Sequence, residues 1–230
     1  MTDELFPRAM SLAVHELRTP VTVAAGYLRM LLKEQAGPIT DKQRKMLEEA
    51  ERACGRIGAL VAEMSEMGKL ESRELQIARA PFDLDALVAE VASDMHEGHD
   101  RGVQLDLRGA GQPVMVTGDR ARIVTAVRAL THATLRERGE PGTVVATVAT
   151  ATGSPAWGVF AVGDADAIDA LVAGAGTATS DGFDEWRGGM GLALPVARRV
   201  VDALGGALWS AAGDRPRAGS ALRLPLVNAS

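Results

Sequence analysis

Two long stretches of the sequence repeat apolar residues at alternating steps of four and three. The first lies within residues 3–34, and the second follows a break at Gly37-Pro38. This spacing places one apolar stripe along each helix, as in helices packed in a coiled coil or bundle. The stripe residues are Met10, Val14, Leu17, Val21, Ala24, Leu28 and Leu31 in the first stretch, and Met46, Ala50, Ala53, Ile57, Leu60, Met64 and Met67 in the second.

A short connection joins the two predicted helices. The first helix is expected from Asp3 to Glu34, and Gly37-Pro38 ends it. Thr40 is suited to cap the second helix, with Gln43 completing a capping box. Two helices alone bury only one narrow stripe each, so we expect this antiparallel hairpin to dimerise into a four-helix bundle. A hairpin that packs on the rest of its own chain is the alternative.

Length and composition set limits on the rest of the chain. The 230 residues, 47% hydrophobic and 24% charged, suffice for two small folded domains. A net charge of −5 provides no basic surface for nucleic acid. The single cysteine, Cys54, excludes an internal disulfide and predicts a reducing, cytoplasmic location. No apolar run approaches the ~20 residues that span a bilayer, so we expect no membrane segment.

Strands and helices alternate in the second half of the chain. After a boundary near residues 71–81, a third helix is expected from Phe82 to about His99. Strands are expected at 103–107, 114–116, 143–150, 157–162, 207–210 and 221–226, and helices at 119–137 and 191–204. Trp157, Trp186 and Trp209 are expected to pack inside this part. The order predicts helices on one face of a mixed sheet, so the whole chain is of the α+β class.

One hexapeptide of the first helix, His15-Glu16-Leu17-Arg18-Thr19-Pro20, combines reactive side chains. His15 follows a stripe residue, so its ring should flank the stripe and reach solvent, and Thr19 lies one turn later on the same face. An imidazole nitrogen accepts a phosphoryl group when its N–H proton is removed, and Glu16 is placed to take that proton. A surface histidine beside a solvated acidic residue is the alternative.

These residues resemble the transmitter region of two-component sensor histidine kinases. The hexapeptide matches the H-box of that family at every position, and Gly189-Met190-Gly191 with the following helix resembles its G2 box. Phe183 and Trp186 stand where the family carries its F-box aromatics. The resemblance covers residues 5–227.

The resemblance implies two domains: a dimerisation and histidine-phosphotransfer hairpin at residues 1–74, and a Bergerat-type α/β sandwich of the HATPase_c kind at residues 75–230. It implies that His15 is the phospho-acceptor, Glu16 the base, and Thr19 the residue that positions water for dephosphorylating a response regulator. The implied partners are a second copy of the chain, the receiver domain of a response regulator, and an upstream histidine kinase.

The N-box of that family departs most from the pattern. An ungapped alignment places its two asparagines at Ala129 and Ala133. Magnesium requires oxygen ligands, which alanine lacks, and the adjacent His132 is a poor magnesium ligand. We therefore predict no metal ligand.

The G1 box is also incomplete. Its aspartate, which would bond the adenine amino group, remains as Asp164, but Asp166 and Ile168 replace the two glycines that allow close approach of the nucleotide. Gly189 and Gly191 before a helix N-terminus remain suitable for phosphate. The residues left for ATP are thus Asp164, Gly189 and Gly191, and the segment 169–187 would form a short lid.

Three functions remain open at this stage. In the first, His15 passes a phosphoryl group to or from receiver aspartates, with an impaired ATP site and with response-regulator phosphatase activity as a companion. In the second, the chain is a kinase that phosphorylates His15 with ATP and magnesium. In the third, it is a dimeric pseudokinase that binds partners and transfers no phosphate. The intact H-box argues against the third, and the missing asparagines and glycines argue against the second.

Overall fold

A computed structural model describes residues 5–72, 76–153 and 156–227 and divides the chain into two compact units. The hairpin unit comprises residues 1–75, and the sheet unit comprises residues 76–230. The class and architecture agree with the predicted helical hairpin followed by an α/β part with a mixed sheet. Among the described helices, none combines the length and apolar character needed to cross a bilayer.

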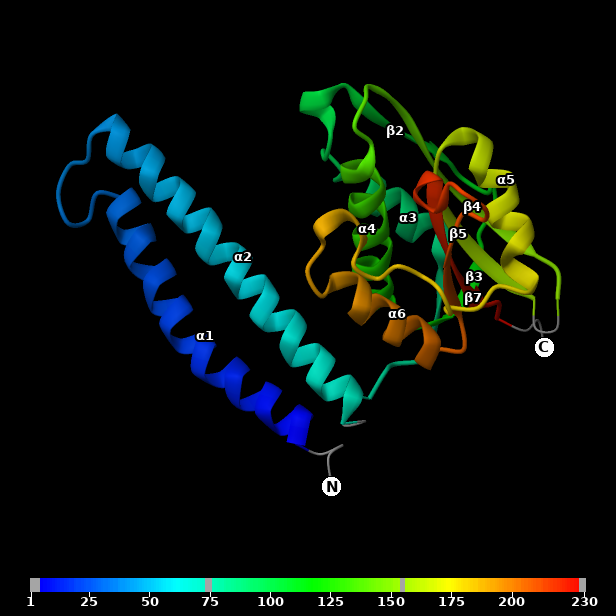
Figure 1. Cartoon of the computed structure of the whole chain (residues 1–230), viewed down its shortest axis with the longest axis horizontal. Coiled ribbons are helices and arrows are strands. Elements are labelled where there is room, and N and C mark those ends of the chain that lie inside the picture. The colour runs from blue at the N-terminus through cyan, green and yellow to red at the C-terminus, as the bar shows by residue number, and fades with distance from the viewer. Residues whose placement is uncertain (1–4, 73–75, 154–155, 228–230) are drawn as a thin grey trace. The chain divides into compact units, whose positions relative to one another are not determined.

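The hairpin unit consists of α1 (Leu5–Leu32) and α2 (Asp41–Glu71), which run antiparallel (Figure 1). The predicted capping box is present: the Gln43 amide donates to the Thr40 hydroxyl at 3.3 Å, and the Thr40 amide donates to Gln43 Oε1 at 2.8 Å. Arg44 also ties the loop, because it donates to the Leu32 carbonyl at 3.1 Å and pairs with Glu34 at 2.5 Å. The turn between the helices is therefore held from both sides.

Only part of the apolar stripe is covered within the hairpin. Val14, Val61 and Met67 are buried, whereas several large apolar side chains of the two helices are exposed. The exposed side chains are Leu12, Leu17, Val23, Tyr27, Met30, Met46, Ile57 and Leu60. The contact between α1 and α2 thus leaves a second apolar surface unpaired within one copy of the chain.

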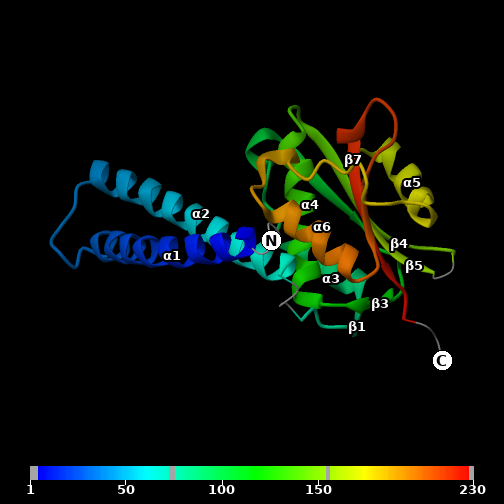
Figure 2. The same ribbon diagram turned by 60° about the horizontal axis from the view of Figure 1, so that its bottom comes forward.

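A five-stranded mixed sheet organises the sheet unit, in the order β2-β4-β5-β7-β6. The strands are β2 (Val103–Arg108), β4 (Gly142–Ala151), β5 (Trp157–Gly163), β6 (Ala207–Ser210) and β7 (Gly219–Pro225). Strands β2 and β4 are parallel, and the other neighbours are antiparallel. A separate antiparallel ribbon joins β1 (Ala80–Asp83) to β3 (Met115–Gly118) (Figure 2).

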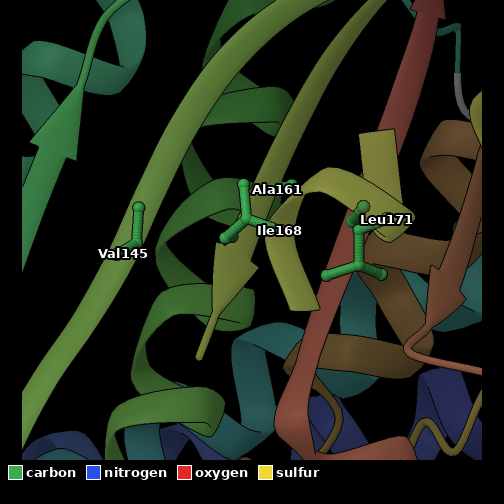
Figure 3. Close-up of a cluster of buried hydrophobic side chains, with 5 residues drawn as sticks. Val145, Ala161, Ile168 and Leu171 are labelled. Atoms are coloured by element: carbon green, nitrogen blue, oxygen red, sulfur yellow. The ribbon is translucent and has the colours of Figure 1, made fainter. Parts of the chain in front are cut away.

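Helices cover both faces of the sheet, so the expectation of one covered face was wrong. On one side lie α3 (Leu84–Ser93), α4 (Arg120–Glu137) and α6 (Ala193–Ala203), and on the other lies α5 (Ala165–Ala173) (Figure 1). Ile168 and Leu171 of α5 pack on Val145, Ala161 and Ala221 of the sheet (Figure 3). This second layer explains why β5 is buried along its whole length, since each face of the strand meets a helix.

Two further expectations need correction. The third helix begins at Leu84 and ends at Ser93 rather than at His99, because the chain turns to bury Met95 and passes through Gly98 at φ +84° into β2. The short strand β1 before it was not predicted. The end of α6 agrees with expectation: Gly205 has φ +82°, and the Gly206 amide donates to the Val201 carbonyl at 2.9 Å.

Candidate functional site

His15 projects from α1 into solvent beside the buried stripe. Its neighbour Val14 is buried against α2, whereas the His15 side chain is 82% exposed. This contrast confirms that the ring flanks the stripe and reaches solvent. The position is suited to a group that must meet another protein, because the helix fixes its backbone while the ring stays accessible.

Glu16 lies next to one nitrogen of the His15 ring. Its Oε1 atom is 3.8 Å from His15 Nδ1, and its side chain is also exposed. This distance exceeds a hydrogen bond, but rotation of two exposed side chains can close it, and catalytic hydrogen bonds often tighten only in the working complex. Thr19 is exposed one turn further along α1. The three predicted residues therefore occupy one accessible stretch of a single helix.

In the sheet unit, the two alanines that the resemblance aligns with the N-box asparagines are buried side chains of α4. Ala129 and Ala133 are both buried, and the backbone of Gly188 lies directly on Ala133. A Cβ atom at Gly188 would lie 2.5 Å from the Ala133 Cα, and Gly188 has φ +65°. The short helix η3 (Arg187–Gly189) thus occupies the space next to Ala133 that a longer side chain would need.

Asp164, the remaining G1 residue, is paired with two arginines. It follows β5 and lines a pocket of about 270 Å³. Arg138, just after α4, donates to one carboxylate oxygen, and Arg215 donates to the other at 2.7 Å. Arg215 also bonds Asp166 at 2.8 Å, and this guanidinium lowers the pKa of the Asp166 carboxyl below its usual value. The four side chains form one continuous charged network.

A third arginine, Arg187, forms a buried ion pair next to this network. The Arg187 side chain is 1% exposed and pairs with Glu137, which is 9% exposed and lines the same pocket. Arg187 Nε donates to Glu137 at 2.9 Å, and its Nη1 donates to the Ser220 hydroxyl at 2.5 Å. The same guanidinium reaches the carbonyls of Pro216, Arg217 and Gly219. It thereby joins η3 to α4 and β7.

The other predicted nucleotide residues lie outside this pocket. Gly189 and Gly191 adopt φ values of +60° and +62° before α6, and neither lines the pocket that contains Asp164. Phe183 is buried, but Trp186 is 65% exposed, so the expectation that all three tryptophans pack inside was wrong for Trp186. The expected lid was also wrong in part, because Asp169 belongs to α5 and Arg187 is buried.

His132 is half-buried on α4, next to the lost N-box position. Its Nδ1 atom lies 3.4 Å from Glu97 Oε2. Burial lowers the pKa of His132; Glu97 raises it, but the charges of Arg136 and Arg128 add to the lowering, and the net pKa is below its usual value. Among the described residues, no three His, Cys, Asp or Glu side chains converge where they could hold a metal ion.

The pH dependence of the free energy of unfolding should report on the protonation of His132. Because the folded protein resists protonation of His132, the unfolded chain binds more protons below about pH 6.5, and the free energy of unfolding should fall as the pH drops. Urea titrations followed by tryptophan fluorescence between about pH 7.5 and 5.5 measure this slope. His132→Gln should flatten it, and His99→Gln, at an exposed ring, controls for the loss of a histidine. An equal slope in wild type and His132→Gln would contradict the assignment.

Sequence reasoning missed the residues that surround Asp164. Arg138, Arg187 and Arg215 come from three separate segments, and no spacing in the sequence links them to Asp164 or Glu137. The one available signal was an arginine, Arg138, directly after the helix α4. By itself, that signal does not predict a partner.

Comparison with known proteins finds matches over part of the chain. The His Kinase A (phospho-acceptor) domain model matches residues 8–73. The histidine kinase BarA of Escherichia coli K12 is 33% identical over 111 residues, covering 47% of this chain and 12% of BarA. The phosphate regulon sensor PhoR of Pseudomonas aeruginosa is 30% identical over 115 residues, covering 49% of this chain and 25% of PhoR. The matched region is thus a small part of these longer proteins.

Solved structures share the fold of both units. Full-length ShkA in complex with AMPPNP aligns with a TM-score of 0.69 at 21% identity, covering 98% of this chain and 47% of ShkA. The Acinetobacter baumannii histidine kinase AdeS aligns with a TM-score of 0.57 at 22% identity, covering 93% of this chain and 98% of AdeS. The chain therefore shares its fold, a helical hairpin followed by an α/β part, with these two structures. Residues 8–73 thus match a phospho-acceptor domain of histidine kinases, and about half of the chain is similar in sequence to signal-transduction histidine kinases.

Proposed function

We propose that this chain moves a phosphoryl group between His15 and an aspartate of a response-regulator receiver domain, and that its own ATP site is impaired. The observation that carries the proposal is the contrast between the two units. His15 and Glu16 are exposed and adjacent in a hairpin that matches a phospho-acceptor domain. In the sheet unit, Asp164 is instead bonded to Arg138 and Arg215 of the same chain.

The chemistry of the transfer follows from the positions of His15 and Glu16. The ring nitrogen far from Glu16, Nε2, attacks the phosphorus of an aspartyl phosphate. The P–N bond forms, the P–O bond to the aspartate breaks, and the aspartate leaves as a carboxylate. The proton on Nδ1 then passes to Glu16, whose Oε1 lies 3.8 Å away. The reverse sequence returns the phosphoryl group to a receiver, and Thr19 would position water for its hydrolysis.

Several features of the sheet unit support an impaired ATP site. Ala129 and Ala133 supply no oxygen ligand for magnesium, and the Gly188 backbone fills the space beside Ala133. Asp166, which stands at a G1 glycine position, places a carboxylate in the first turn of α5, where Arg215 binds it. Phosphoryl transfer from ATP depends on a metal ion to neutralise the phosphates. The residues present therefore do not fit a magnesium nucleotide, and no step of the proposed transfer requires one.

A homodimer is part of the proposal. Eight large apolar side chains of the hairpin stay exposed in one copy of the chain, including stripe residues Leu17, Met46, Ile57 and Leu60. Exposed apolar side chains in this number on two packed helices are what a further helix pair would cover. We assign residues 1–74 to dimerisation and phosphotransfer and residues 75–230 to an HATPase_c-like domain, with the dimer forming a four-helix bundle through the hairpin.

Transfer of labelled phosphate tests the proposal. A receiver domain carrying labelled aspartyl phosphate should label the wild-type chain, and His15→Ala should reduce that label to background. Glu16→Gln should slow labelling by about a hundredfold, because a positioned base contributes this order of rate. His99→Ala, which removes a different exposed histidine, should label like wild type.

Labelled ATP with magnesium, without any receiver, distinguishes the remaining candidates. We expect no label at His15 under these conditions. Label that disappears in His15→Ala would overturn the impaired-site proposal in favour of a working kinase, a reading kept open by the retained Asp164. No label from either donor would favour a pseudokinase that transfers no phosphate.

A further inference from the structure

The pocket beside Asp164 is lined by both apolar and charged side chains. It has a volume of about 270 Å³, and apolar and charged groups meet on its walls. Its lining residues are Thr134, Glu137, Arg138, Val144, Asp164, Arg215, Arg217 and Ala218. Because Glu137 Oε1 is buried without a hydrogen bond, the site also holds a polar atom with unused bonding capacity.

The acidic group of this pocket is held by the chain itself. Arg138 donates to Asp164 Oδ1 from the end of α4, and Arg215 donates to Asp164 Oδ2 from the segment between β6 and β7. Charge-assisted hydrogen bonds of this kind are stronger than neutral ones. A ligand that offered an amino group to Asp164 would therefore have to displace at least one guanidinium group.

The two arginines differ in how firmly they are held. The Arg138 side chain is 29% exposed, whereas that of Arg215 is 55% exposed. Arg215 also lies in an exposed turn that contains Gly213 at φ +82°. Exposed ion pairs contribute little free energy and weaken as salt increases. Arg215 is therefore the side chain that can leave the pocket at low cost.

We propose that Arg138 and Arg215, together called the arginine pair, are built-in competitors that keep this pocket closed to flat heterocycles bearing an amino group. The Asp164 carboxylate would bond such an amino group, and Val144, Ala218 and the Thr134 methyl group would contact the ring. Release of Arg215 opens the pocket, and its return closes it. This inference rests on the proposed impaired nucleotide site. It attributes the loss of base binding to the arginine pair, which substitution can remove.

Titration of the full chain with adenosine, without magnesium, tests the arginine pair by calorimetry. Adenosine is the probe because it has the amino-bearing ring and no phosphate, so the missing magnesium ligands do not affect the result. We expect no saturable binding of adenosine to wild type. R138M/R215M should bind adenosine at least about tenfold more tightly, because no guanidinium group then competes with the amino group of adenosine for Asp164. Adding Asp164→Ala to the double variant should abolish the gain, because alanine offers no acceptor to the amino group.

Arg217→Met is the matched control, because Arg217 lines the same pocket but does not contact Asp164. It should bind adenosine no better than wild type. A gain equal to that of the double variant would mean that pocket charge, and not the arginine pair, governs binding, and would overturn the inference. Adenosine binding by wild type as tight as by the double variant would overturn it too.

Folding of the double variant is checked by its thermal unfolding and tryptophan fluorescence. If it does not fold, the R215M single variant decides the question. Arg215 is exposed, so this variant should fold, and it should show a smaller gain in affinity for adenosine. A folded R215M or R138M/R215M without any gain contradicts the inference. Labelling of His15 by a phosphorylated receiver should persist in these variants, so the arginine pair can be wrong while the proposed phosphotransfer stands.

Discussion

Arg187→Met is expected to destabilise the sheet unit by about 3 to 5 kcal/mol, the usual cost of removing one partner of a buried ion pair. The change removes the guanidinium that bonds Glu137 and Ser220 and leaves the Glu137 carboxylate buried. It also leaves the carbonyls of Pro216, Arg217 and Gly219 without this donor. Unfolding by urea, followed by tryptophan fluorescence, measures the change. All three tryptophans lie in the sheet unit, so the signal reports on that unit alone.

Arg217→Met provides the matched control for this prediction. Arg217 approaches the same Glu137 at 3.7 Å, but its side chain is 75% exposed, so its loss should cost less than about 1 kcal/mol. A double variant, Arg187→Met with Glu137→Met, should recover part of the loss, because removing both charges avoids a buried unpaired carboxylate. Equal stability of Arg187→Met and Arg217→Met would show that burial of the Arg187–Glu137 pair does not matter.

The hairpin could be predicted from sequence because its determinants are local. Apolar steps of four and three residues define each helix, and Thr40 with Gln43 defines a start that lies within a few residues of the break. The exposure of His15 followed from its position next to Val14, because Val14 lies on the apolar stripe and His15 lies just beside it. Each of these inferences needs only neighbours in the sequence, and each agrees with the structure.

Helix α5 shows where sequence reasoning failed although a local signal existed. Alignment with the G1 box gives Ile168 the place of a glycine and hides its place in a helix. In the structure, Ile168 and Leu171, three residues apart, form the apolar side of a helix that packs on the far face of the sheet (Figure 3). The helical spacing of these residues, considered without the motif, would have predicted the second layer.

The charged groups around Asp164 could not have been predicted in this way. Asp164 is separated by 26 positions from Arg138 and by 51 from Arg215. Glu137 and Arg187 are 50 positions apart. These contacts depend on the order β4-β5-β7 in the sheet and on the path of the segments around it, which no local spacing encodes. The departures from the N-box and G1 patterns were visible in the sequence, but the side chains packed around those positions were not.

Ala133→Asn, which restores an asparagine at an N-box position, is expected to destabilise the sheet unit by about 2 to 6 kcal/mol and to give no labelling by ATP. Ala133 is buried, and a Cβ at Gly188 would lie 2.7 Å from its Cβ, so the longer side chain would meet the backbone of η3. Arg187 anchors η3 to Glu137 and therefore resists its displacement. The side-chain amide of the new asparagine would also be buried without hydrogen-bond partners. Urea unfolding and labelled ATP with magnesium measure the two effects.

Ala121→Asn, at an exposed position of the same helix, separates crowding from helix propensity. It should cost less than about 1 kcal/mol, the difference in helix propensity between the two residues. If Ala133→Asn is as stable as Ala121→Asn, the backbone at Gly188 yields easily and does not fill the N-box space. If Ala133→Asn also labels His15 from ATP, the impairment reduces to the missing asparagine. A destabilised variant without label agrees instead with crowding of the longer side chain by the backbone at Gly188.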